Sequence, residues 1–166
     1  MAIQSALTGH LVFSTLHTND AASAVARLMD LGIEPYLLSS SLLAVLAQRL
    51  VRKVCVACSA DRDFSPEERR QLGFVSEDQD RHHYRAGSGC DQCRKTGYRG
   101  RVAICELLIV DQMIRGRVQA RASATEIRDS ALAAGMRLLR DDGIEKILSG
   151  ITTPSEVARV TVRTEM

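Results

Sequence analysis

The sequence has no apolar run near the ~20 consecutive residues that a membrane-spanning helix requires. Its first residues lack the charged and then apolar order of a secretory signal, so we expect a cytoplasmic protein with no membrane-spanning segment. Aromatic residues make up only 4% of the chain and tryptophan is absent, which leaves few rings for stacking on nucleic-acid bases. Because the formal net charge is only +2, any nucleic-acid binding must be local.

The composition is otherwise that of a globular protein. The chain has 166 residues, of which 45% are hydrophobic and 25% are charged, so disorder throughout is excluded. This length suits one domain, or a core piece with a small appendage, and can bury a sizeable apolar interior.

Four of the five cysteines form two C-x2-C pairs, Cys55/Cys58 and Cys90/Cys93. Each pair makes a tight knuckle, and the 31 residues between Cys58 and Cys90 let the knuckles meet. In a reducing compartment this pattern favours metal thiolates over disulfides. Four cysteines with no open position predict a structural zinc site. The alternative is a pair of redox dithiols. Cys105 is left over and is expected to be a buried, inert thiol.

Four basic residues adjoin the cysteines: Arg52, Lys53, Arg94 and Lys95. Four thiolates around Zn²⁺ carry a charge near −2, which these cations are expected to offset. His82 and His83 lie between the two pairs, and we expect them to be solvated because four cysteines already satisfy the metal.

The first 32 residues predict an α/β unit. The apolar, β-rich segment 10–16 indicates a buried strand that ends in a polar loop. Asn19 or Asp20 can cap a following helix, and Gly32 can end it. Pro35 then predicts a second helix, whose apolar positions continue to Val51.

The region between the cysteine pairs predicts a short helix and a loop. Ser65 and Glu68 form a capping box, and Gly73 offers a stop. Residues 76–89 are polar and lack apolar periodicity, which favours a mobile loop.

After the second pair, residues 101–110 predict a strand that returns to the core. Asp111 is expected to cap the next helix. Two further capping boxes predict helix starts: Ser123 with Glu126, and Thr153 with Glu156.

The remaining chemistry lies around two histidines. In α/β proteins ligands bind at the carboxyl ends of strands, which puts His17 with Thr18 and Asn19 at a candidate site and His10 at the opposite end. No phosphate loop is present, because segment 89–96 has Arg94 where the second glycine of G-x4-G-K-T is needed.

Residues 8–20, TGHLVFSTLHTND, resemble the histidine box of the secretion and pilus-assembly ATPases, which include the type II secretion ATPases called GspE and their pilus relatives. The resemblance continues in order through nearly the whole chain. Its further blocks are Arg27-Leu28, Gly32, the LLSSSLLAVLAQRLVR stretch ending at Arg52, the four cysteines, 97–101 (GYRGR), Glu106-Leu107, Gly135-Met136, Asp142-Gly143 and 150–153 (GITT).

This resemblance implies the C-terminal part of a RecA-like P-loop ATPase core. We expect residues 1–54 to belong to that core, residues 55–96 to form an inserted tetracysteine zinc module, and residues 97–166 to supply the return strand and a helical subdomain. The parent would be a homo-hexamer that uses ATP and Mg²⁺ to drive pseudopilus assembly and protein export. Its partners would be neighbouring subunits and inner-membrane secretion-system components, and through these components it would be peripheral to the inner membrane.

By the same likeness, His17 and His10 would sense the γ-phosphate of ATP. The phosphate loop and the acidic motifs that hold Mg²⁺ are absent from the sequence, so we expect this chain alone not to hydrolyse ATP. The alternative reading is a free-standing zinc-ribbon-like module that binds nucleic acid through four cations, Arg94, Lys95, Arg99 and Arg101.

Overall fold

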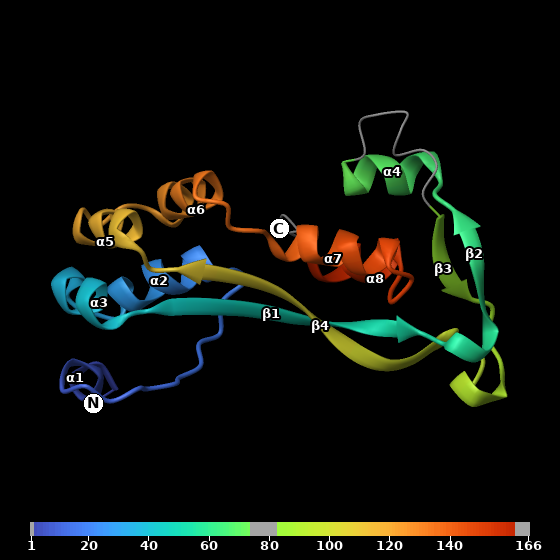
Figure 1. Cartoon of the computed structure of the whole chain (residues 1–166), viewed down its shortest axis with the longest axis horizontal. Helices are drawn as coiled ribbons and strands as arrows, with labels where there is room; N and C mark the ends of the chain where they lie inside the picture. Colours follow the sequence, from blue (N-terminus) through green and yellow to red (C-terminus); the bar gives the residue numbers. More distant parts are fainter. Residues whose placement is uncertain (1, 74–82, 162–166) are drawn as a thin grey trace. The chain divides into compact units, whose positions relative to one another are not determined.

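The computed structural model describes residues 2–73 and 83–161, which form two compact units (Figure 1). Unit 1 comprises Met1–Ala47 and Glu106–Leu138, and unit 2 comprises Gln48–Cys105 and Leu139–Met166. Helices combine with two small sheets, so the expected α/β class is confirmed. The expected boundaries at residues 54 and 96 stay a prediction. In the described part of the chain, no helix is both long and apolar enough to cross a membrane.

Unit 1 is mainly helical. Its helices are α1 (Ala2–Leu7), α2 (Ala21–Asp30), α3 (Pro35–Ser41), α5 (Gln112–Gln119) and α6 (Ala124–Ala133). The starts of α2, α3, α5 and α6 follow the predicted signals, whereas no signal predicted α1. Asp20 caps α2 by accepting a hydrogen bond from the backbone N–H of Ser23 (2.7 Å), and Asp111 caps α5 in the same way. The capping box at Ser123 is also formed. The sequence signals therefore identify these helix starts correctly.

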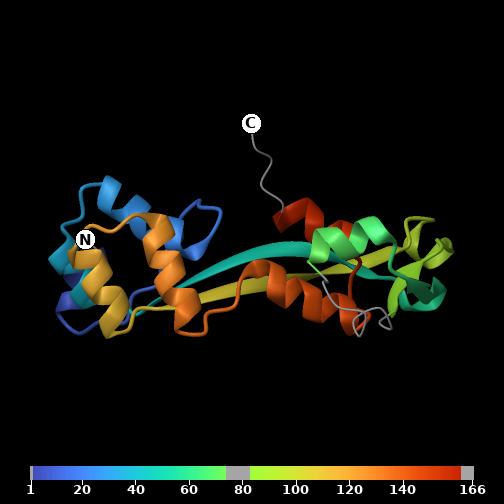
Figure 2. The ribbon, with the colours of Figure 1, turned by 90° about the horizontal axis from the view of Figure 1, so that it is seen from above.

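The core of unit 1 is one cluster of aliphatic side chains. Its buried members are Ala21, Ala22, Val25, Leu38, Leu108, Val110, Ile114, Val118, Ala122, Ile127 and Ala131. They come from α2, α3, α5, α6, the end of strand β4 (Tyr98–Ile109) and the connecting segments. The successive helices α5 and α6, drawn in orange shades, are seen from above in Figure 2. Burial of these aliphatic groups is the main stabilising contribution in unit 1.

The helix predicted from Pro35 to Val51 is wrong in its second half. Helix α3 ends at Ser41, and strand β1 (Ala44–Val54) follows and pairs with β4 (Tyr98–Ile109). Hydrogen bonds join Cys55 N to Gly97 O and Val110 N to Leu43 O, both at 2.9 Å, so the strands run antiparallel. A nearly continuous apolar run has no clear period, and pairing with a distant strand decides its structure. The strand predicted at 101–110 is confirmed.

The buried strand predicted at residues 10–16 is also wrong. Residues 10–18 have neither helical nor strand structure, and Leu11 and Phe13 are 71% and 88% exposed. A strand requires a neighbouring strand to satisfy its backbone groups, and no strand of the described residues pairs with this segment. β-rich composition alone cannot supply that partner.

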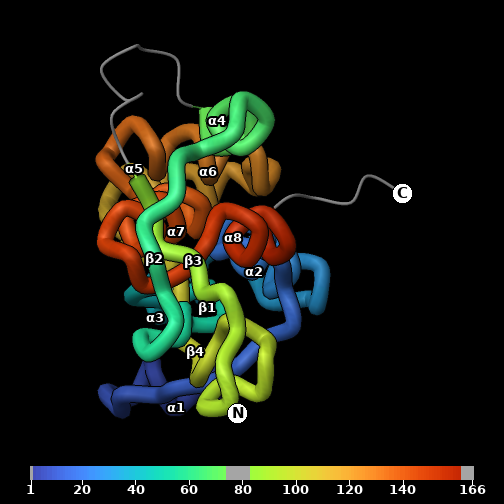
Figure 3. The backbone as a smooth tube through the Cα atoms, turned by 90° about the vertical axis from the view of Figure 1, so that its right-hand side faces the viewer, coloured from blue at the N-terminus to red at the C-terminus, as the bar shows by residue number. Residues whose placement is uncertain are grey.

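Unit 2 contains the remaining elements. They are η1 (Val56–Cys58), β2 (Ser59–Asp63), α4 (Pro66–Leu72), β3 (His83–Gly87), η3 (Asp91–Cys93), α7 (Leu139–Leu148) and α8 (Pro154–Thr161). Strands β2 and β3 pair antiparallel, from Ser59 opposite Gly87 to Asp63 opposite His83 (Figure 3). The loop expected over residues 76–89 is therefore wrong at 83–87, because this polar stretch pairs with β2. Residues 74–82, with His82, lie outside the described residues.

A small aromatic and aliphatic cluster packs the helices of unit 2 against the β2–β3 pair of strands. Its buried members are Phe64, Leu72, Tyr84, Ile147 and Val157. The rings of Phe64 and Tyr84 lie 4.9 Å apart, and the Tyr84 hydroxyl donates to Glu68 (3.0 Å). Burial first, and then this hydrogen bond, raise the pKa of Tyr84 to about 12. Tyr84 thus remains a neutral donor that links β3 to α4.

Candidate metal centre

Two short turns at the end of unit 2 carry the four paired cysteines. Cys55 follows β1 and precedes η1, and the backbone N–H of Cys58 returns to Cys55 O (3.3 Å). In the second turn the N–H groups of Cys93 and Lys95 both return to Cys90 O, at 3.2 and 2.8 Å. Each turn therefore presents two sulfur atoms on a short hydrogen-bonded loop.

The structure brings these four sulfurs together. All four Sγ atoms of Cys55, Cys58, Cys90 and Cys93 lie within 4.8 Å of one another. Three of the separations are 3.9 Å (Cys55 to Cys90), 3.9 Å (Cys58 to Cys93) and 3.8 Å (Cys90 to Cys93).

These separations match a metal site and not disulfides. A tetrahedron of thiolates with Zn–S bonds of about 2.3 Å has edges of about 3.8 Å, whereas a disulfide requires an S–S distance of about 2.05 Å. All four thiols are free. The donor set and its geometry thus fit a tetrahedral zinc ion with no position left for a substrate.

Backbone amides support the sulfur of Cys93. The N–H groups of Cys90 and Gly97 donate to it at 3.1 and 3.3 Å. These hydrogen bonds lower the pKa of Cys93 to about 6, and the bond from the Cys90 N–H makes the largest contribution. Burial raises the pKa of Cys58 to about 11.

Glycines allow the second turn to approach β3 closely. A side chain at Gly87 would place its Cβ 2.2 Å from the carbonyl oxygen of Gly97, and one at Gly89 would lie 2.7 Å from that of Lys95. Gly89 and Gly97 also have φ angles of +93° and +76°. Sequence reasoning missed these positions, although the glycines that flank the second pair were a signal for them.

A buried carboxylate ties the strand that leads into the cluster to helix α8. Glu156 is 1% exposed, and its carboxylate accepts hydrogen bonds from the Arg52 backbone (2.8 Å) and guanidinium (2.9 Å). It also accepts one from Arg159 (2.9 Å). Burial works to raise the pKa of Glu156, but the arginine hydrogen bonds outweigh it and lower the pKa to about 2.

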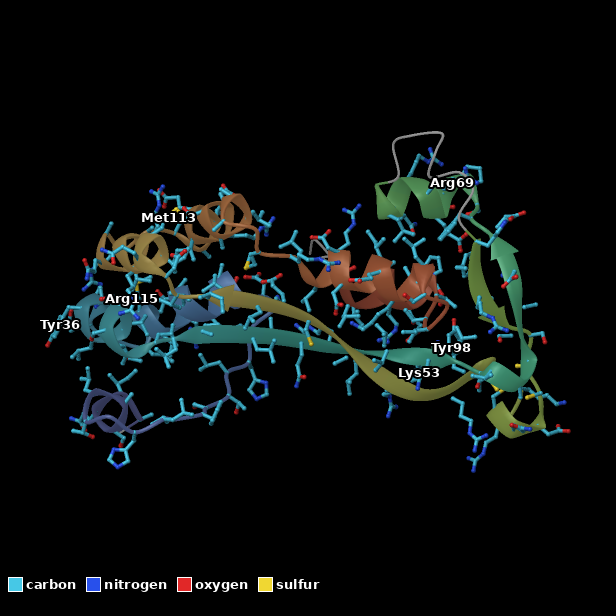
Figure 4. The ribbon with its side chains drawn as sticks, viewed as in Figure 1. Tyr36, Lys53, Arg69, Tyr98, Met113 and Arg115 are labelled. Carbon is cyan, nitrogen blue, oxygen red and sulfur yellow. The ribbon has the colours of Figure 1, made fainter. Side chains whose placement is uncertain are left out.

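This network corrects two sequence-based expectations. Helix α8 does begin next to Thr153, but the Glu156 carboxylate binds Arg52 and Arg159 in place of completing a capping box. Arg52, expected to offset the thiolate charge, is instead bound to Glu156 and lies 4.1 Å over the ring of Tyr98. Figure 4 labels Tyr98 and Lys53 on the two strands that lead to the cluster.

Other residues named from the sequence have partners of their own or lie in unit 1. Lys95 is ion-paired with Asp91 (2.9 Å), and exposed His83 with Asp63 (2.5 Å). Cys105 is half-buried and was expected to be fully buried. Of the two histidines of unit 1, His17 is exposed, and Nδ1 of exposed His10 lies 3.2 Å from the hydroxyl of Thr8.

Comparisons with known proteins match nearly the whole chain. Residues 1–159 match the family described as "Type II/IV secretion system protein". The chain is 49% identical to the type IV pilus assembly ATPase PilB of Thermus thermophilus, over 98% of this chain and 18% of that protein. It is 47% identical to the type II secretion system protein HxcR of Pseudomonas aeruginosa and to the type II secretion system protein E of Aeromonas hydrophila. These two matches each cover 97% of this chain, and 30% and 32% of the respective relatives. The chain thus spans less than a third of the length of these relatives.

Proposed function

The chain belongs to the type II/IV secretion system protein family, and on that premise we propose that it is the C-terminal segment of a hexameric ATPase that powers pseudopilus assembly and protein export. Two of the relatives described above are named as type II secretion system proteins, and one is named as a pilus assembly ATPase. In this proposal the motor works in the cytoplasm against inner-membrane components. Its ATP and Mg²⁺ chemistry requires a phosphate loop, which the sequence of this chain does not contain.

The role proposed for unit 2 is that of a module braced by zinc. The observation that carries this proposal is the convergence of four thiols, from two turns distant in sequence, within 4.8 Å of one another. Four cysteines fill a tetrahedral zinc ion, so the site supplies folding energy and has no position for a reacting water. The ion joins the end of β1 to the turn that precedes β4.

The role proposed for His17 is contact with the γ-phosphate of bound ATP, and for His10 a lesser part in the same contact. This proposal rests on the resemblance of residues 8–20 to the histidine box. The exposed position of both side chains leaves them accessible to a nucleotide held by other parts of the motor. An imidazole hydrogen bond to the terminal phosphate would distinguish ATP from ADP.

Metal analysis of the purified, reduced chain tests the proposal for unit 2. We expect one zinc per chain and a large loss of zinc in Cys90→Ser. The matched control is Cys105→Ser, which removes the cysteine outside the cluster and is expected to retain the metal. Zinc-free wild-type protein, or equal loss in both variants, would contradict the proposal.

ATP turnover tests the role in the motor. We expect negligible hydrolysis by this chain alone and zinc-dependent hydrolysis by a full-length protein of the family that carries this segment. Substitution of His17 by Ala in that protein is expected to lower kcat by about 10²-fold, since it would remove a contact strengthened in the transition state. Robust turnover by this chain alone would refute the assignment of catalysis to a separate phosphate loop.

No specific observation favours the alternative function, a free-standing zinc-ribbon-like module that binds nucleic acid. Two of its four proposed cations have protein partners, because Lys95 lies 2.9 Å from Asp91 and Arg99 donates to Gln92 at 3.3 Å. We therefore do not advance it as a second function.

A further inference from the structure

Glu106 makes a long-range contact to which the sequence patterns assign no role. It lies in the part of β4 that belongs to unit 1, and only 2% of its surface is exposed. Its Oε1 accepts a hydrogen bond from the backbone N–H of Ala21 at 2.9 Å. Ala21 is the first residue of α2 and lies 85 positions earlier in the chain. The bond therefore links β4 directly to the start of α2.

Two carboxylates, one near in sequence and one distant, accept hydrogen bonds from the first turn of α2. The near one is Asp20, which has an extended backbone and accepts a hydrogen bond from the Ser23 N–H at 2.7 Å. The first N–H groups of a helix have no partner within the helix, and their partial positive charge favours anions. Asp20 lies in the same turn as the amide that it binds, whereas Glu106 lies in strand β4, which is distant in sequence. Glu106 is thus the contact that can hold the helix start relative to β4.

Burial of the first turn of α2 reinforces this anchor. Ala21 and Ala22 are 0% and 1% exposed, and Val25 is 0% exposed. A shift of the helix start would expose these side chains and leave the Glu106 carboxylate buried without the Ala21 donor. Both consequences are unfavourable, so the position of this turn is strongly specified.

The anchored turn is continuous with the histidine segment. His17 lies three residues before the cap Asp20, and the Thr18 hydroxyl donates to Asp20 O at 3.3 Å. We propose that Glu106 is a positioning residue, which fixes the 17–20 turn against β4 and so places the His17 imidazole for contact with the terminal phosphate of ATP. This inference rests on the nucleotide-sensing role proposed above for His17.

The anchor is tested in this chain by NMR, with amide exchange at Ala21 and the imidazole resonances of His17 as readouts. In Glu106→Leu we expect Ala21 exchange to accelerate about tenfold, as for loss of one charge-assisted hydrogen bond, with a shift of the His17 resonances. Glu106→Gln retains an acceptor oxygen and should accelerate exchange by only about twofold to threefold. The Ser23 amide, bound by Asp20, is an internal control that should change less than Ala21.

A matched variant separates positioning from general loss of stability. Glu126→Ala removes the capping box of α6 in the same unit, and we expect it to leave the His17 resonances unchanged. Equal shifts of His17 in Glu106→Leu and Glu126→Ala would overturn the inference. If Glu106→Leu does not fold, Glu106→Gln decides. A larger acceleration of exchange, relative to wild type, at Ala21 than at Ser23 supports the anchor, and equal accelerations refute it.

The kinetic test uses a full-length protein of the family in which this segment replaces the equivalent region. We expect Glu106→Leu to lower kcat about tenfold with little change in KM for ATP, because a misplaced contact weakens the transition state more than ground-state binding. Glu126→Ala should change neither constant. Unchanged kcat in Glu106→Leu would overturn the positioning role. A parent without ATP hydrolysis would instead refute the proposed function, while the NMR result on the anchor would still stand.

Discussion

Unit 1 packs eleven buried apolar residues into one cluster, whereas the cluster in unit 2 has five among the residues that the structure describes. Unit 2 adds the four converging thiols and the buried Glu156, which binds two arginines. Small cores seldom supply enough burial to stabilise a fold, and a structural metal can compensate. Removal of one partner from a buried ion pair is costly because it leaves the other charge uncompensated. We infer that the stability of unit 1 depends on aliphatic packing. The stability of unit 2 would depend more on a metal bound by the four thiols and on the ion pairs of Glu156.

Removal of the metal is expected to have the largest effect, because it should destabilise unit 2 and leave unit 1 folded. Treatment with a strong zinc chelator is expected to unfold unit 2, because structural zinc contributes about 10–16 kcal/mol of apparent free energy in small zinc modules. Hydrogen exchange read segment by segment should show lost protection in 83–105 and retained protection in α2, α5 and α6. Equal loss in both units, or no loss in either, would show that the metal does not brace unit 2 in particular.

Two fully buried isoleucines provide a matched test of packing. Ile127 lies in the cluster of unit 1 and Ile147 in that of unit 2, and both are 0% exposed. Each Ile→Ala change should cost about 2–5 kcal/mol in the free energy of unfolding. With zinc bound, we expect Ile127→Ala to melt unit 1 at a lower denaturant concentration while Ile147→Ala leaves the metal in place. Loss of zinc from Ile147→Ala would mean that packing, not the metal, holds unit 2 together.

Acid should weaken unit 2 through Glu156. The pKa of this carboxyl is about 2 in the folded chain, against an ordinary value of 4.5. Its stabilising contribution is therefore complete above pH 4.5 and is lost as the pH falls toward 2. Because the guanidinium groups of Arg52 and Arg159 are about half exposed, we expect Glu156→Gln to cost about 2 kcal/mol at pH 7.

The measurement for Glu156 is urea unfolding at several pH values. Glu156→Gln should lose this part of the pH dependence, whereas exposed Asp61→Asn should behave as wild type. If wild type and Glu156→Gln lose stability in parallel as the pH falls from 4.5 toward 2, other groups cause the acid response.

The smallest expected effects come from two capping boxes, one in each unit. Ser65 caps α4 and Ser123 caps α6, and each side chain accepts from the N3 backbone N–H. Ser→Ala at either position should cost about 1 kcal/mol. Exchange rates should rise in the helix that lost its cap. If Ser65→Ala affects α6 as strongly as α4, the two units do not unfold separately.

Local signals in the sequence predict most helix starts correctly. Caps at Asp20, Ser65, Asp111 and Ser123 act within one turn, so the residues that form them lie close together in the chain. The four cysteines were also singled out as a set, because C-x2-C spacing makes each knuckle locally; zinc as their metal stays a prediction. Their convergence is what the structure adds.

The errors arise where a distant partner decides the structure. β1 was assigned to a helix because its apolar run has no distinctive period, and its pairing with β4 is a long-range property. Segment 10–16 was assigned to a buried strand, although no described strand pairs with it. The contacts of Glu156 with Arg52 and of Glu106 with Ala21 span 104 and 85 positions, so no local pattern could predict them.

X-ray absorption at the zinc edge on the purified, reduced chain examines the four sulfurs and their metal together. We expect one zinc per chain with four sulfur neighbours at about 2.3 Å, and no nitrogen or oxygen in the first coordination sphere. Fewer than four sulfur ligands, or a metal-free protein with its cysteines joined as disulfides, would contradict this expectation.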